Sequence, residues 1–217
     1  MFTAVIPVKK NSKRFPNKNI KPFGNENLLT RKIRQVKSSG IADKIIVSSD
    51  CEIMLKIAKN LNVETIKRPK NLADESKPLS DFFLYITSIV PNGHLIWSCV
   101  TSPLFDENLM IDAKLKYEQA LKNGYDSLIT IYKFKHYIMD KKGPLNYQLG
   151  KNHLNSDQLE PFDLFTNGII IAPIKSVLKW KYNYGPKAYR YEVNQKASID
   201  IDTELDYLCA LAYYNNS

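Results

Sequence analysis

The sequence predicts an α/β fold with one largely parallel sheet that helices cover on both faces. Short apolar runs that suit buried strands alternate along the chain with longer segments of helical period. Because parallel strands are joined by crossover helices, this alternation indicates a mostly parallel sheet. Ligands of such sheets bind beyond the carboxyl ends of the strands. The strand candidates are residues 2–8, 44–49, 94–99, 127–132 and 167–173.

Apolar stripes of helical spacing follow the first two strand candidates. Side chains three and four residues apart share one face of an α-helix, which is the face that packs on a sheet. The stripes are Leu29, Ile33 and Val36 after the first strand and Ile53, Ile57 and Leu61 after the second. Residues 108–122 are predicted to form a further helix between the third and fourth strands.

Composition limits the class of protein and of partner. The chain has 217 residues, of which 44% are hydrophobic and 24% charged, and it shows no internal repeat or low-complexity linker. This predicts one folded domain over residues 1–217 rather than a disordered chain. The net charge of +9 favours an anionic partner, which could be nucleic acid, an anionic membrane or a phosphorylated small molecule.

The cysteines and the hydropathy pattern indicate the compartment. Cys51, Cys99 and Cys209 are far apart and show no CxxC spacing, which argues against a disulfide framework or a zinc site. No apolar run is long enough to span a bilayer. We therefore expect a protein of the reducing cytoplasm that needs no membrane.

Residues 133–165 interrupt the strand and helix pattern. The segment is polar, rich in Lys and Asn, and has no sustained period. Long irregular segments of compact domains tend to be functional or mobile, so this excursion could serve a dimer contact or close a site. The alternative is a solvated loop or hairpin.

A cationic loop directly follows the first strand candidate. Binding a nucleoside triphosphate requires cations together with N–H and O–H donors in one loop, and this loop has both. It contains neither the GxxxxGK[ST] pattern of a P-loop nor GxGxxG. The alternative interpretation is a solvated basic turn. The cations are Lys9, Lys10, Lys13, Arg14, Lys18 and Lys21, and the polar residues between them are Asn11, Ser12, Asn17 and Asn19.

Two aspartates near the end of the chain are candidate metal ligands. Polar and apolar residues alternate over residues 198–203, which predicts a half-buried strand end with Asp200 and Asp202 on the same side. Two such carboxylates suit a Mg²⁺ ion that keeps some of its waters and bridges to phosphate oxygens. In the alternative, Asp202, Thr203 and Glu204 only begin the last helix.

Six segments stand in an order and spacing that match one known family. They are VKKNSKRFPNKN (8–19), IIVSSD (45–50), RPKNLADE (68–75), TSPL (101–104), NGIII (167–171) and SIDIDTELD (198–206). With them the chain resembles the acylneuraminate cytidylyltransferases, the CMP-sialic acid synthetases, over nearly its whole length. The resemblance implies a Rossmann-like three-layer α/β/α sandwich of the nucleotide-diphospho-sugar transferase type that usually forms a homodimer. It also implies transfer of CMP from CTP to the anomeric hydroxyl of an acidic sugar, with release of pyrophosphate, for surface polysaccharide or glycan biosynthesis.

The resemblance also assigns roles to individual residues. Lys18 would be the essential cation, and Asp200 and Asp202 would hold Mg²⁺. Asn167 and Gly168 would line the acceptor pocket, and further residues would contact the triphosphate or border the nucleotide and the sugar. For the triphosphate these are Lys9, Asn11, Ser12, Lys13, Lys18 and Asn19, and for the border of the site they are Arg68, Asp74, Cys99, Thr101 and Ser102.

Differences from the family pattern leave the acceptor open. Lys9 and Phe105 stand where most members have Arg, and Cys99 stands where they have Gln. The acceptor could be a sialic or modified nonulosonic acid, another sugar acid or a different anion. Enzymes that activate 3-deoxy-manno-octulosonic acid usually have Lys-Pro where this chain has Lys18 and Asn19, which favours a nonulosonic acid. A nucleotide-sugar-dependent glycosyltransferase, a basic nucleic-acid-binding module and a family member without turnover remain alternatives.

Overall fold

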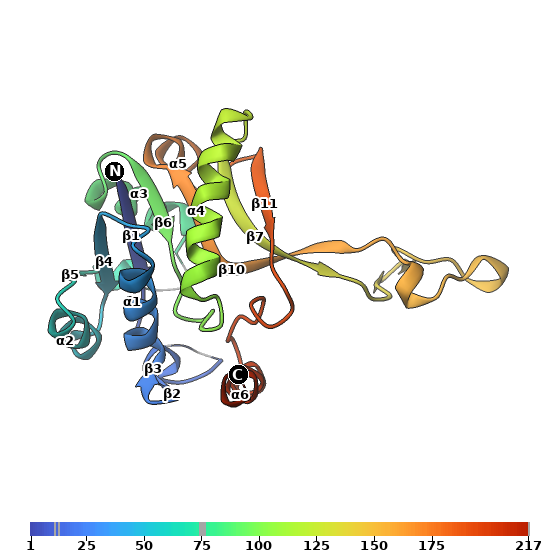
Figure 1. The fold of residues 1–217 in the computed structure, drawn as a ribbon, viewed down its shortest axis with the longest axis horizontal. Coiled ribbons are helices and arrows are strands. Elements are labelled where there is room, and N and C mark those ends of the chain that lie inside the picture. The colour runs from blue at the N-terminus through green and yellow to red at the C-terminus, as the bar shows by residue number, and fades with distance from the viewer. Residues whose placement is uncertain (11, 13, 74–76, 217) are drawn as a thin grey trace.

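The computed structural model describes residues 1–10, 12, 14–73 and 77–216, and in that part of the chain a seven-stranded sheet forms the centre (Figure 1). The strand order is β11-β7-β10-β6-β1-β4-β5. Only β10 runs against its neighbours in this sheet, so the predicted mostly parallel α/β sheet is confirmed. The strands are β1 (Phe2–Pro7), β4 (Lys44–Ser49), β5 (Glu64–Lys67), β6 (His94–Trp97), β7 (Ser127–Phe134), β10 (Phe162–Pro173) and β11 (Ala188–Glu192).

Helices cover both faces of the sheet. One apolar core lies between the sheet and α1, α2, α4 and α6, and a second lies between the sheet and α3 and α5. Strand β1 contributes to both, since Ala4 and Ile6 belong to the first core and Val5 to the second. In the described residues no helix is both long and apolar enough to cross a membrane. The helices are α1 (Leu28–Ser39), α2 (Glu52–Asn60), α3 (Leu79–Ile89), α4 (Glu107–Lys122), α5 (Ile174–Trp180) and α6 (Glu204–Asn215).

Short elements connect these layers. The first turn of α1 is closed by Asn27, whose side chain accepts a hydrogen bond from Thr30 N at 2.9 Å, and Gly40 ends the helix in the left-handed conformation. The short elements are the 3₁₀ turns η1 (Lys18–Ile20), η2 (Lys70–Leu72), η3 (Gly150–Asn152) and η4 (Ser156–Gln158) and the strands β2 (Pro22–Phe23), β3 (Glu26–Asn27), β8 (Met139–Asp140) and β9 (Gly143–Pro144).

The excursion over residues 133–165 is a long arm that projects from the sheet (Figure 1). Its two ends are not irregular, because β7 and β10 continue into it as an antiparallel pair that joins Lys133 to Asp163 and Phe134 to Phe162. Further out lie β8, β9 and two 3₁₀ turns. Residues 133–165 therefore form an extended hairpin with structure of their own.

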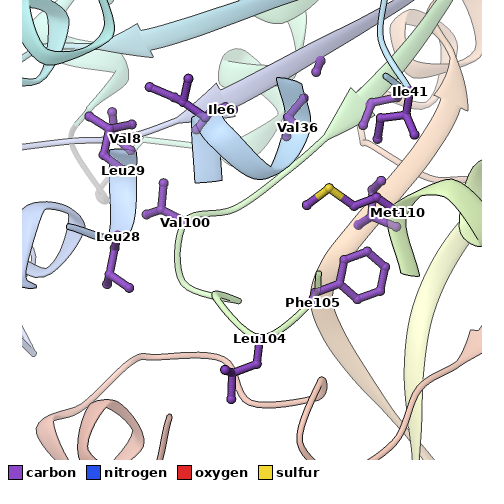
Figure 2. Packing of buried hydrophobic residues seen from close by; sticks show 14 of the residues in the cluster. Ile6, Val8, Leu28, Leu29, Val36, Ile41, Val100, Leu104, Phe105 and Met110 are labelled. Atoms are coloured by element: carbon purple, nitrogen blue, oxygen red, sulfur yellow. The ribbon is translucent and has the colours of Figure 1, made fainter. Parts of the chain in front are cut away.

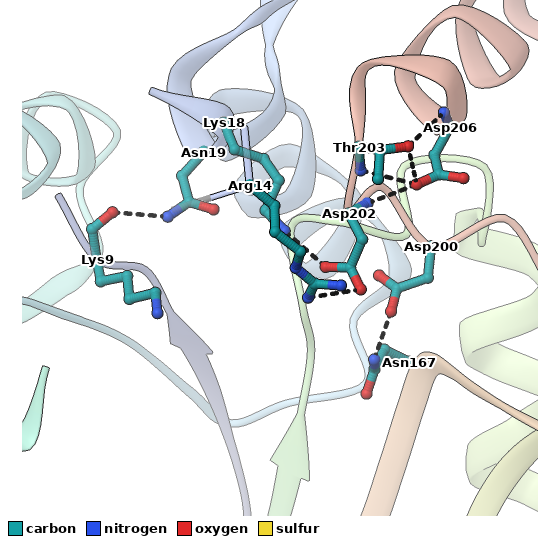
Figure 3. Close-up of polar contacts among 9 residues, drawn as sticks. All are labelled: Lys9, Arg14, Lys18, Asn19, Asn167, Asp200, Asp202, Thr203 and Asp206. Carbon is teal, nitrogen blue, oxygen red and sulfur yellow. Dashed lines mark hydrogen bonds and ion pairs between the residues drawn. The ribbon is translucent and has the colours of Figure 1, made fainter. Parts of the chain in front are cut away.

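The strand predicted over residues 198–203 is wrong. The segment belongs to no strand of the sheet, although Ile201 N donates a hydrogen bond to Thr101 O at 2.8 Å. The alternation has another cause: Ile201 is fully buried in the core, whereas Asp200 on one side of it points toward Asn167 and Asp202 on the other side points toward Lys18 (Figure 3). Thr203 caps α6 in a capping box with Asp206, so capping and a site role coexist here.

Candidate active site

A cavity of about 380 Å³ opens at the carboxyl ends of β1 and β6. This is the edge where ligands of parallel sheets bind. One part of its wall is polar and cationic, and another part is apolar. The polar part comprises Lys9, Ser12, Lys18, Asn19, Lys77 and Thr101, and the apolar part comprises Val8, Leu72, Pro78, Leu79 and Phe82.

Lys18 and Asp202 link the basic loop to the end of the chain (Figure 3). Lys18 Nζ donates to Asp202 Oδ1 at 2.9 Å, and Arg14 Nη2 lies 2.9 Å from Asp202 Oδ2. The Lys18 side chain is 12% exposed and that of Arg14 is 67% exposed, so Lys18 is the cation held in place. Two segments 184 residues apart in sequence thus meet at one carboxylate.

Asn19 fixes the backbone at the end of the first strand. It is buried, and its Nδ2 donates to Lys9 O at 2.9 Å (Figure 3). The asparagine therefore shapes the loop, while the side chains of Lys9 and Lys18 remain part of the cavity wall.

One carboxylate oxygen of Asp200 accepts a hydrogen bond, and the other has no hydrogen-bond partner. Its Oδ2 accepts from Asn167 Nδ2 at 2.5 Å, whereas its buried Oδ1 has no hydrogen-bond partner. Buried polar atoms are nearly always satisfied, so this atom points to a missing ligand. Mg²⁺ is bound by one or two carboxylates together with waters and phosphates, and that donor set fits Asp200 and Asp202. No group of three or more His, Cys, Asp or Glu side chains that could hold a metal by itself occurs in the described residues.

Arg68 lies in the cavity wall but is held by the sheet. Its Nη2 donates to Val8 O and Ser48 O at 2.7 Å each, and its guanidinium lies 4.5 Å from the centre of the Phe82 ring. Burial lowers the pKa of Arg68 to about 10, so it stays charged at neutral pH. Arg68 therefore ties the ends of β1 and β4 together and adds positive charge next to the cavity.

The loop over residues 99–105 forms another side of the site. Cys99, Val100 and Thr101 line the cavity. Burial, and secondarily the charge of Asp200, raise the pKa of the Cys99 thiol to about 12, so it stays protonated and acts as a packing residue. We expected Ser102 at the border of the site. It is buried and is not among the residues that line the cavity.

Phe105 and Gly168 lie outside the cavity and pack against each other. Phe105 is fully buried in the core (Figure 2), and a Cβ placed on Gly168 would lie 2.8 Å from its ring. Gly168 is therefore needed for close packing, and its place in the acceptor pocket stays a prediction. Asn167 also lies outside the cavity wall and faces Asp200 instead.

Three expected site residues, Asn11, Lys13 and Asp74, lie outside the described residues. Sequence reasoning missed two others. Arg14 was noted only as part of the basic loop, and Lys77 was not considered, although it lines the cavity just before α3. Their charge was visible in the sequence, but no spacing rule joins them to the aspartates.

Comparison with known proteins identifies the family. A family model described as cytidylyltransferase matches residues 3–214. The chain belongs to the cytidylyltransferase family. It is 25% identical over 215 residues to the pseudaminic acid cytidylyltransferase of Campylobacter jejuni, and the match covers 93% of this chain and 91% of that protein. It is also 25% identical over 216 residues to the N-acylneuraminate cytidylyltransferase of Escherichia coli, covering 96% of this chain and 51% of that protein.

A solved structure shares the fold. The structure of CMP:2-keto-3-deoxy-manno-octonic acid synthetase complexed with CTP matches with a TM-score of 0.74 at 10% identity and covers 99% of this chain and 98% of that one. The family model and the curated relatives confirm the resemblance to the acylneuraminate cytidylyltransferases, and the protein is a nucleotidyltransferase enzyme. The glycosyltransferase alternative loses its support.

Proposed function

We propose that this cytidylyltransferase transfers CMP from CTP to the anomeric hydroxyl of a sialic or related nonulosonic acid and releases pyrophosphate. The observation that carries the proposal is the ion pair between Lys18, which lines a cavity with a cationic wall, and Asp202, two residues from Asp200. The relatives named for pseudaminic acid and N-acylneuraminate support the acceptor class.

The two parts of the cavity wall suggest how CTP lies. The apolar part, with Leu79 and Phe82, suits a cytosine ring and a ribose face. The cationic part, with Lys9 and Lys18, suits the triphosphate. This orientation brings the phosphates toward Asp200 and Asp202.

Positioning and charge neutralisation carry most of the catalysis of nucleotidyl transfer. In the protein as described, Asp202 holds Lys18 by an ion pair. We propose that the triphosphate takes over Lys18 as it binds, so that the ammonium stabilises the leaving pyrophosphate. Arg14, largely exposed on the other oxygen of Asp202, would move with it.

Asp200 and Asp202 are the residues that would hold Mg²⁺. The buried and unpartnered Oδ1 of Asp200 supports this assignment, and Asn167 fixes the other oxygen of the same carboxylate. When bound, the ion would add positive charge at the α-phosphate and lower the pKa of the acceptor hydroxyl. Release of Lys18 to the phosphates would leave Asp202 free for that role.

The acceptor pocket differs from the family pattern at Cys99. The thiol lines the cavity where the resemblance implies a Gln side chain, so one neutral side chain that both donates and accepts hydrogen bonds is lost there. Phe105 does not reach the cavity and therefore does not contact the acceptor in our proposal. A modified nonulosonic acid with a less polar group near Cys99 fits this change.

We also propose that two copies of the chain form a homodimer through the arm. The arm carries several exposed apolar side chains, and apolar surface that gathers on one element often marks a contact with another protein. A second copy would cover them, as the resemblance implies, and sedimentation of the purified protein would test it. The side chains are Tyr137, Met139, Leu145, Leu149 and Leu154.

The test is pyrophosphate release by the purified protein with Mg²⁺. CTP is combined in turn with N-acetylneuraminic, legionaminic, pseudaminic and 3-deoxy-octulosonic acids, and ATP, GTP and UTP serve as nucleotide controls. We expect release with CTP and a nonulosonic acid. Release with another nucleotide, or with 3-deoxy-octulosonic acid alone, would contradict the proposal.

A further inference from the structure

Lys32 is a lysine buried within α1. Its side chain is 0% exposed, and its Nζ donates to Ser102 O at 2.9 Å and to Phe105 O at 3.4 Å. Among the ion pairs of the described residues none pairs Lys32 with a carboxylate. Burying a lysine in this way is costly, because desolvation penalises its charge. Its location therefore calls for an explanation beyond packing.

The carbonyls that Lys32 binds belong to the loop over residues 99–105. Most of this loop is buried and it lies outside helices and strands, so its buried backbone carbonyls need donors from side chains. Helix α1 supplies them from one face, because Arg31 Nε and Gln35 Nε2 donate to Pro103 O at 2.9 and 3.1 Å. Lys32 donates to the carbonyl oxygens of Ser102 and Phe105, which lie on either side of Pro103 in the sequence. Val100, Leu104 and Phe105 of the loop lie among the core side chains in Figure 2.

The same loop contacts the site in three places. Its first residues, including Thr101, line the cavity. Thr101 O accepts a hydrogen bond at 2.8 Å from the amide of Ile201, the residue between the two aspartates. At its other end Phe105 packs on Gly168, which follows the asparagine that binds Asp200.

We infer that Lys32 is a positioning residue that places Asp200 and Asp202 for catalysis by holding the loop over residues 99–105. Lys32 itself touches neither aspartate nor the cavity. It acts through the loop backbone, from Ser102 O to Thr101 O and on to the Ile201 amide. The catalytic part of this inference rests on the proposed function, whereas the structural part does not.

The chemistry of an amine suits this role better than that of a hydrocarbon. Burial lowers the pKa of Lys32 to about 7; the nearby charge of Arg31 lowers it further, whereas those of Glu107 and Asp106 oppose the shift. The neutral amine still has two N–H groups, which is enough to satisfy both carbonyls. A methionine would fill the same space and leave both carbonyls without this donor.

The test compares Lys32→Met with Ile33→Val, a matched core change on the same helix. Hydrogen exchange of the Ile201 amide is followed in the full-length protein without substrate. In Lys32→Met we expect this amide to exchange at least about tenfold faster, with the amides of β1 and β4 changed less than about twofold. Ile33→Val should show no selective effect at Ile201. Lys32→Gln, which keeps an N–H donor group on a shorter side chain, should lie between Lys32→Met and the wild type, and it replaces Lys32→Met in the test if that variant does not fold.

Turnover provides the second readout. In Lys32→Met, kcat should fall at least about tenfold while the KM for CTP stays within about threefold, since the cavity wall is kept but the carboxylates are displaced. Ile201 exchange that matches the wild type, or that rises equally across the core, would overturn the inference. If the wild type shows no turnover, the proposed function fails while the exchange result still decides the role of Lys32.

Discussion

The buried lysine predicts a specific pH dependence of stability. Its pKa falls from an ordinary value of 10.5 to about 7 because burial disfavours the charged form. Between these values the unfolded chain binds a proton that the folded chain does not, so stability should rise with pH. From pH 6 to 8.5 the contribution of Lys32 to the free energy of unfolding should rise by about 2 kcal/mol, at about 1.4 kcal/mol per pH unit above the folded pKa.

Urea unfolding of the wild type and Lys32→Met, followed by tryptophan fluorescence, measures this contribution. The other titrating groups are common to both proteins, so the difference between their unfolding free energies isolates Lys32. The pH range ends below 9.0, the ordinary pKa of cysteine. Above that pH the Cys99 thiol loses its proton in the unfolded chain but keeps it in the folded chain, which lowers the free energy of unfolding. The wild type should gain about 2 kcal/mol relative to the variant from pH 6 to 8.5. If the difference between the two unfolding free energies stays constant with pH, burial does not lower the pKa of Lys32 and the reasoning is refuted.

Three further predictions concern the site and its support. Asp200→Asn should lower kcat at least about a hundredfold, because it removes a carboxylate charge that would hold Mg²⁺, and it should leave the urea midpoint unchanged; a variant that turns over as fast as the wild type would contradict the metal role of Asp200. Lys18→Met should weaken CTP binding in calorimetry much more than CMP binding, while Lys10→Met, the exposed control, should alter neither; equal losses for both nucleotides would contradict the pyrophosphate role. Gly168→Ala should lower the free energy of unfolding by about 1–3 kcal/mol, because its Cβ would press on the ring of Phe105. An unchanged urea midpoint would show that the ring can move aside.

The strands of the centre could be predicted from sequence because burial on both faces gives them continuous apolar runs. The run over residues 44–49 gave β4 with its observed bounds. A different pattern, the alternation of polar and apolar residues, was misleading at residues 198–203. It arises there because Ile201 is buried in the core, and no neighbouring strand pairs with this segment. Hydropathy indicates which residues are buried, whereas the pairing of strands depends on which distant segments come to lie side by side.

The candidate site could be predicted in part. The basic loop and the two aspartates carry enough charge and pattern to be noticed, and the structure brings Lys18 and Asp202 together. Gly168 was expected to line the acceptor pocket, and nothing in the sequence indicated that it packs against Phe105. Lys32 gave no signal at all, because a lysine on an amphipathic helix is ordinarily exposed, and only the loop it binds accounts for its burial.

Phosphorus NMR of one reaction mixture tests the central claim most directly. The purified protein, CTP, Mg²⁺ and a nonulosonic acid are followed until CTP is consumed. The proposed function predicts a CMP diester and pyrophosphate in equal amounts, and neither product when the acid is omitted or when Asp200→Asn replaces the wild type. Formation of free CMP or CDP in place of the diester, or CTP that persists with every acid tested, would contradict it.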